Sequence, residues 1–131
     1  MAATTLSSLE KKMRLAALGY PGAVEEFPWG ERVIKVNKKI FLFVNISDGT
    51  FCVTLKLPHT GEMALSLSFV EPTGYGLGKA GWVSARFDRA DEVPLALLLE
   101  WLEESYRAVA PKKLVQALEE QAATRTRKRA R

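Results

Sequence analysis

Lysine side chains gather where the chain is predicted to reverse direction, and they are the residues best suited to hold a ligand. Lys35, Lys38 and Lys39 surround one predicted turn, and Lys79 lies in another. Lys56 and Arg86 lie in strand-like segments. Cationic side chains contact phosphates without reading base sequence. The pattern predicts a phosphate-binding surface, although lysines on turns and edge strands can also simply keep a sheet soluble and block edge pairing.

The last seven residues form a second cationic segment. They carry five of the 19 basic side chains and no acidic one, so the rest of the chain carries 14 basic against 15 acidic side chains. The net charge of +4 therefore belongs to the C-terminus, and DNA binding by the body must depend on local patches. Such a segment binds any polyanion through counterion release, or serves only as a solubilising extension. Its cations are Arg125, Arg127, Lys128, Arg129 and Arg131.

Residues for catalysis or metal binding are scarce. One histidine, His59, and one cysteine, Cys52, cannot supply the three or four ligands of a zinc site. Cys52 alternates with apolar neighbours, which indicates a buried small side chain rather than a nucleophile. The adjacent Glu25 and Glu26 point in different directions and do not form an acid–base pair. We therefore expect a binding protein with no catalytic residue, no metal and no cofactor.

The central part of the chain predicts an antiparallel meander. Three runs rich in β-branched and aromatic residues are separated by Asn37-Lys38 and by Ser47-Asp48-Gly49, which are hairpin-turn sequences. Connections this short force neighbouring strands to be antiparallel. The predicted strands are Arg32–Val36, Ile40–Ile46 and Phe51–Leu57.

In the sequence, one helix is predicted before this meander, and further helices and a second strand pair are predicted after it. A helix is expected over Ser7–Leu18, with Ser7 and Glu10 as a capping box, and a weaker helix over Gly61–Phe69. A fourth strand, Val70–Leu77, is expected to be irregular or at an edge because of Pro72 and Gly74, and a tight turn at Gly78–Gly81 leads into Trp82–Phe87. Two C-terminal helices follow, one after Asp91 and one after Pro111. Large aromatics are assigned to the core, namely Trp29, Phe41, Phe43, Phe51, Trp82 and Trp101.

Length and composition indicate one α+β domain. The chain of 131 residues is 47% hydrophobic and 26% charged, as in ordinary globular proteins. Residues 1–122 are expected to form a single domain and residues 123–131 a disordered basic tail. No apolar run approaches the length of a membrane span, and a single cysteine fits a reducing compartment, so we expect a cytoplasmic protein.

Several short motifs together resemble the MmcQ/YjbR family. They are Phe27-Pro28-Trp29-Gly30, then Val33–Val36 with Lys39 and Phe41, Leu55-Lys56-Leu57, Tyr75 with Gly78-Lys79 and Trp82-Val83, and Glu104–Arg107 with Val109. The resemblance covers roughly Leu9 to Lys113. It implies a two-layer α/β sandwich with the order helix, three strands, helix, two strands, helix, built on a five-stranded antiparallel sheet, with an extra C-terminal helix here. The order of elements derived from the residues is the same.

The resemblance also implies a DNA-binding-like "double wing" of two β-hairpins. At the matching positions, Lys35, Lys39, Lys56 and Lys79 would contact phosphate. The second hairpin departs from the family pattern, because Gly78, Ala80 and Gly81 replace its polar and basic residues and leave that wing with less charge.

The leading hypothesis is therefore a protein that contacts DNA phosphates through two hairpins and its basic tail. One alternative is a protein-interaction or chaperone-like domain, with a homodimer left open, because the same topology resembles secretion chaperones that bind protein. Another is a small-molecule site between the sheet and the helices. The predicted DNA contacts are Lys35, Lys38, Lys39, Lys56, Lys79, Arg86, Arg125, Arg127, Lys128 and Arg129.

Overall fold

Two tight turns build the centre of the sheet. Asn37 and Lys38, with φ of 51° and 68°, join β2 (Val33–Val36) to β3 (Lys39–Ser47). Asp48 and Gly49, with φ of 50° and 77°, join β3 to β4 (Thr50–Lys56). Two successive positive φ values suit the right-handed twist of a hairpin. The predicted meander is confirmed, and its pairing is antiparallel throughout.

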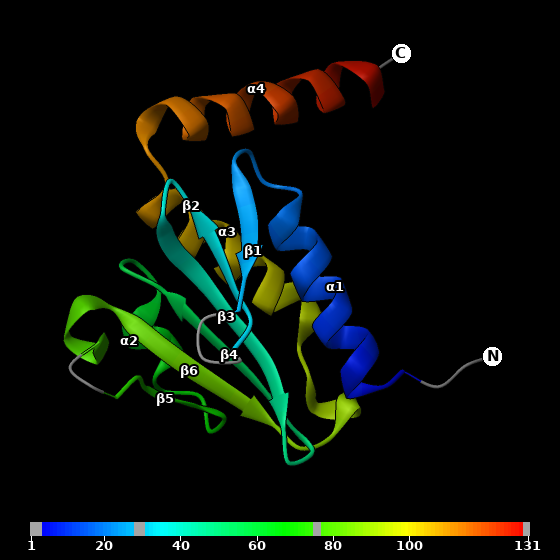
Figure 1. The fold of residues 1–131 in the computed structure, drawn as a ribbon, viewed down its shortest axis with the longest axis vertical. Helices are drawn as coiled ribbons and strands as arrows, with labels where there is room; N and C mark the ends of the chain where they lie inside the picture. Colours follow the sequence, from blue (N-terminus) through cyan, green and yellow to red (C-terminus); the bar gives the residue numbers. More distant parts are fainter. Residues whose placement is uncertain (1–3, 28–30, 75–76, 130–131) are drawn as a thin grey trace.

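The computed structural model describes residues 4–27, 31–74 and 77–129, without the side chains of residues 78, 79 and 125–129. Its sheet has six antiparallel strands in the order β1-β2-β3-β4-β6-β5 (Figure 1). The outer members are β1 (Ala23–Glu26), β6 (Trp82–Phe87) and β5 (Val70–Pro72).

The expectation of five strands was wrong, because β1 was missed. Its sequence, Ala-Val-Glu-Glu, has little intrinsic strand preference, and the segment is held by pairing with β2. The edge position of β5 is confirmed. The α+β class holds, with four α-helices accompanying the sheet.

Two helices cover one face of the sheet. Helix α1 (Leu6–Leu18) and helix α3 (Leu95–Val109) pack against β3 and against each other (Figure 1). Side chains alternate between the two faces of β4 and β6, so every second residue of these strands enters this core, whereas β2 and β3 each bury two adjacent residues near the register shift at Ile34 and Lys35. The buried strand residues include Leu42, Val44, Val53, Leu55 and Val83.

The start of α1 differs from the prediction. Thr5, not Ser7, is the N-cap, and its Oγ1 accepts a 3.0 Å hydrogen bond from the Ser8 backbone N–H. The Ser8 Oγ in turn accepts from the Thr5 backbone N–H at 3.1 Å. Glu10 therefore takes no part in capping. Its side chain is buried, and its Oε2 accepts a 2.9 Å hydrogen bond from the Arg32 guanidinium. It also pairs with Arg14 at 3.2 Å.

Three other predictions are corrected. Helix α2 is only Gly61–Ala64, and beyond it the Ser66 hydroxyl bonds to the Met63 carbonyl oxygen, which competes with further helix. The connection from β5 to β6 contains the 3-10 helix η2 (Leu77–Ala80) in place of a tight hairpin tip. Helix α4 (Lys112–Arg129) continues through most of the segment expected to be disordered, since its residues are good helix formers without Gly or Pro.

Among the described residues, none of the helices is long and apolar enough to cross a membrane. Residues 28–30 of the family motif lie outside the described residues, and the core assignment of Trp29 lies there with them.

Candidate functional site

The face of the sheet opposite α1 and α3 carries the candidate site. Leu42, Leu55 and Val83 point into the core. Successive side chains of a strand point to opposite faces, so the neighbouring Phe43, Lys56 and Trp82 lie on this open face. Two hollows lie on it, and both are lined by strands β3, β4 and β6.

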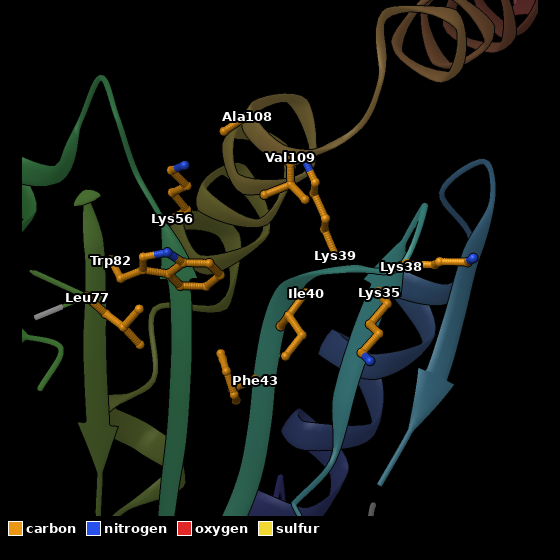
Figure 2. A pocket seen from close by; sticks show the side chains of 10 residues that line it. All are labelled: Lys35, Lys38, Lys39, Ile40, Phe43, Lys56, Leu77, Trp82, Ala108 and Val109. Atoms are coloured by element: carbon orange, nitrogen blue, oxygen red, sulfur yellow. The ribbon is translucent and has the colours of Figure 1, made fainter. Parts of the chain in front are cut away.

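The first hollow, here called the basic hollow, has a volume of about 450 Å³. Figure 2 shows Lys56 and Trp82 on one side of it and Lys35 and Lys39 on the other. It lies where β3 begins and β4 ends, beside the C-terminal end of α3. Its lining residues are Lys35, Lys38, Lys39, Ile40, Phe43, Lys56, Leu77, Trp82, Ala108 and Val109.

Four lysines from three places in the chain thus line the hollow, and Figure 2 shows the side chains of Lys39 and Lys56 directed to the end of α3, with that of Lys38 pointing outward. Lys38 and Lys39 come from the β2–β3 turn and the residue after it, and Lys35 comes from β2. Lys56 is the last residue of β4, and its Cα pairs directly with that of Trp82 on β6. Cross-strand partners have adjacent side chains.

The basic hollow retains a net positive charge. Lys35 forms an ion pair with Glu26 at 3.2 Å. Within the described part of the chain, no acidic side chain lies within ion-pairing distance of Lys38, Lys39 or Lys56. Three cations with no acidic partner around one concave surface favour an anionic ligand.

Two aromatic rings form an apolar wall of the same hollow. Phe43 and Trp82 meet edge to face, with 5.8 Å between ring centroids. Both are partly exposed, so their assignment to the core was wrong. In the described residues, the indole N–H of Trp82 has no hydrogen-bond acceptor, although such a group usually finds one when it is buried. The hollow therefore offers an unused donor and ring surface next to its cations.

The second hollow, here called the polar hollow, has a volume of about 360 Å³. A cluster of hydroxyls lines it: the Oγ of Ser84 lies 2.9 Å from Thr54 Oγ1 and 3.0 Å from Thr73 Oγ1. Phe43 and Leu77 line both hollows, so the two are neighbours on one surface.

Two sequence predictions concern residues of the polar hollow. Arg86 lines it, away from the lysines, and pairs with Glu71 at 3.1 Å, so the predicted phosphate contact is not grouped with the others. Cys52 also lines it and is only half-buried, which corrects its expected place in the core. Burial nevertheless raises the pKa of the Cys52 thiol, which keeps it in the protonated, unreactive form.

The remaining predicted contacts cannot be placed in the site. Lys79 belongs to η2, and Arg125, Arg127, Lys128 and Arg129 belong to α4, but their side chains lie outside the described part of the structure. Sequence analysis missed Phe43 and Trp82. The signal was present in the period-two alternation, which separates them from Leu42, Val44 and Val83.

The residues that could do other chemistry are dispersed. In residues 4–27, 31–74 and 77–129, no group of three or more His, Cys, Asp and Glu side chains is placed to hold a metal ion. The only histidine contributes its backbone N–H to Glu104, at 2.9 Å.

Comparison with known proteins identifies the family of this fold. A family model described as YjbR matches residues 18–108. The crystal structure of the Deinococcus radiodurans protein DR2400, a DUF419 domain, is 27% identical and covers 88% of each chain, with a TM-score of 0.65. No curated protein matches the sequence. The family model spans more than half of the chain and agrees with the resemblance seen in its motifs. The chain belongs to the YjbR family.

Proposed function

We propose that this protein binds DNA, and that the basic hollow is the centre of the contact. The observation that carries the proposal is that Lys39 and Lys56, from two strands, reach to the same end of α3 with Lys38 on the rim of the hollow, and that none of the three has an acidic partner among the described residues. Lysine ammonium groups recognise phosphate by charge and not by sequence. Binding of this kind is expected to be strong at low salt and weakly specific.

The proposed contact surface differs from the one expected from sequence, in which two β-hairpins both contact DNA. The first wing, with its turn at Asn37 and Lys38, contributes to the hollow. In place of the second wing, Leu77 of η2 and Trp82 of β6 contribute apolar surface. We further propose that the protein works by binding alone, with no catalytic residue, metal or cofactor.

The test is an electrophoretic mobility shift with duplex and single-stranded DNA at two salt concentrations. The double substitution Lys39→Gln/Lys56→Gln removes two cations of the hollow. Its matched control, Lys11→Gln/Lys12→Gln, removes the same charge from exposed positions on α1, the helix that packs on the opposite face of the sheet. We expect only the first variant to weaken binding, and to lower the salt slope by roughly one unit per lost phosphate contact.

A third variant distinguishes the contribution of the basic hollow to DNA binding from that of the C-terminal cations. It replaces Arg125, Arg127, Lys128 and Arg129 by Gln, which preserves helix propensity in α4. If this variant alone loses binding, the C-terminus is the polyanion site and the hollow is not. Absence of binding by the wild-type chain at low salt would reject the proposal and leave the protein-interaction alternative, including a homodimer.

A further inference from the structure

The two hollows of the open face form one groove with unequal ends. Phe43 and Leu77 line both of them, so the two hollows adjoin and a ligand that fills both would pass these two side chains. The end at Lys39 and Lys56 is cationic. The other end is lined by hydroxyls and by Glu31, and its one arginine, Arg86, is paired with Glu71. The groove therefore places positive charge at one end and, at the other, a hydrogen-bonding surface that carries the carboxylate of Glu31.

The middle of the groove is aromatic and apolar. Trp82 and Phe43 meet there edge to face, and Leu77 beside them is 36% exposed. The indole N–H has no acceptor among the described residues, and Figure 2 shows its nitrogen on the edge of the ring nearer Lys56. A ligand suited to this sequence of surfaces has an anionic group, a flat aromatic group and then polar edges.

We infer that the groove holds DNA as a single strand, with a phosphate on Lys39 and Lys56 and an unpaired base against Trp82 and Phe43. The inference rests on the proposed function and names the form of the ligand. Polar edges of that base, or of its neighbour, meet the hydroxyls of Thr54 and Ser84. Aromatic side chains that take up exposed bases next to a cationic track are the usual means of single-strand binding.

A duplex fits these surfaces less well. Its bases are stacked on one another, so their faces cannot reach a ring that lines a concave surface unless a base is first unpaired. A duplex would use the lysines and leave Trp82, Phe43 and the hydroxyl cluster without a ligand. The aromatic wall therefore adds affinity only for a strand whose bases are free.

Fluorescence anisotropy provides the test, with three labelled probes: a mixed-sequence single-stranded oligodeoxynucleotide, the same sequence closed into a hairpin duplex, and a mononucleotide. We expect the full chain to bind the single strand at least tenfold more tightly than the duplex. Trp82→Leu should weaken single-strand binding about tenfold and leave duplex binding unchanged. Trp82→Phe should restore most of the loss. The control Phe27→Leu removes an exposed ring outside the groove and should change nothing.

A second measurement needs no variant and so does not depend on the folding of Trp82→Leu. Ultraviolet cross-linking of a bromodeoxyuridine-containing single strand to the wild-type chain should give an adduct at Trp82 or Phe43. Equal affinity for single strand and duplex, with no adduct on either ring and an effect of Lys39→Gln/Lys56→Gln, would overturn the inference and leave the proposed function standing. Failure of all three probes would overturn both. A mononucleotide that binds as tightly as the oligonucleotide would replace the strand by a free nucleotide and also overturn the inference.

Discussion

The hydroxyl oxygen of Ser105 accepts a 2.9 Å hydrogen bond from the backbone N–H of Lys56. The same hydroxyl donates a 2.6 Å bond to the carbonyl oxygen of Phe41, and the side chain of Ser105 is fully buried. Helix α3 is thereby tied to the end of β4 and to β3, the strand that begins at Lys39. The spacing of the two lysines thus depends on one hydroxyl in the core.

Replacement of Ser105 by Ala should destabilise the fold. The substitution leaves the N–H of Lys56 and the carbonyl of Phe41 without their partner, and an unsatisfied buried group costs about 1–3 kcal/mol. We expect the free energy of unfolding, measured in urea, to fall by this amount. Ser68→Ala, at an exposed position with no hydrogen bond to any described residue, is the control and should change stability by less than about 0.5 kcal/mol. Equal stability of the two variants would mean that the Ser105 hydroxyl is not a structural tie.

The carboxylate of Glu104 provides a second tie between α3 and the segment after β4. Its oxygens accept bonds from the backbone N–H groups of His59 and Thr60, at 2.9 and 3.1 Å, and from the Thr60 hydroxyl at 2.6 Å. Partial burial acts to raise the pKa of Glu104, but the hydrogen bonds from Thr60 and His59 outweigh it. The pKa is therefore held below the ordinary value of 4.5.

This lowered pKa predicts acid sensitivity. Because the pKa of the folded state is below that of the unfolded state, the stabilisation is complete above about pH 4.5 and is lost as the pH falls through the lowered value. Glu104→Gln should lower the free energy of unfolding by about 1 kcal/mol at neutral pH, and the gap to wild type should close in acid. Urea titrations at a series of pH values measure this. Glu100→Gln, one turn earlier on α3 and exposed, should follow the wild-type curve throughout.

The hairpins of the sheet could be predicted from sequence because their turns carry local information. Asn37, Asp48 and Gly49 are residues that tolerate positive φ, and the structure uses all three in that conformation. Strand β1 could not be predicted this way, since Glu25 and Glu26 favour it only through pairing with β2. The capping box was placed two residues too late because Ser7 and Glu10 match the usual pattern, whereas at the true N-cap Ser8 takes the place of the usual Glu or Gln. Only the tertiary partner of Glu10, Arg32, decides between them.

The positive charge of the site could be predicted from the sequence, but the aromatic wall of the hollow could not. Lysines near a turn indicate an exposed cationic patch, and Lys35, Lys38 and Lys39 indeed share one hollow with Lys56. The ring pair of Phe43 and Trp82 depends on the order of strands, which places β6 beside β4 although β5 precedes it in the chain. No local pattern contains that information.

The N-cap assignment of α1 can be checked by substitution. Thr5→Ala removes the oxygen that accepts from the Ser8 backbone N–H and should cost about 1 kcal/mol of stability. Ser7→Ala should be neutral or slightly stabilising, because Ser7 is exposed inside the helix and alanine has the higher helix propensity. Thermal unfolding followed by circular dichroism distinguishes the two. A larger loss for Ser7→Ala would return the capping role to Ser7.

Substitution of two glycines by alanine can distinguish the effect of backbone strain on stability from the effect of packing. Among the described residues other than their chain neighbours, no heavy atom lies within 4 Å of a Cβ added at Gly49 or at Gly74, so steric contact with these residues is the same in both cases. Gly49 has a φ of 77°, in the left-handed region, whereas the φ of Gly74 lies outside it. Gly49→Ala should therefore cost about 1 kcal/mol, from the clash of Cβ with its own backbone.

Gly74→Ala should instead stabilise the chain, by up to about 1 kcal/mol, because alanine has fewer conformations to lose on folding. The opposite signs, measured as shifts of the urea midpoint in the two variants, test whether the β3–β4 turn needs its left-handed residue. If Gly49→Ala is neutral, the turn relaxes to another type. The register Ser47 to Thr50 would then no longer be fixed by the turn, and pairing further along β3 and β4 would have to hold it.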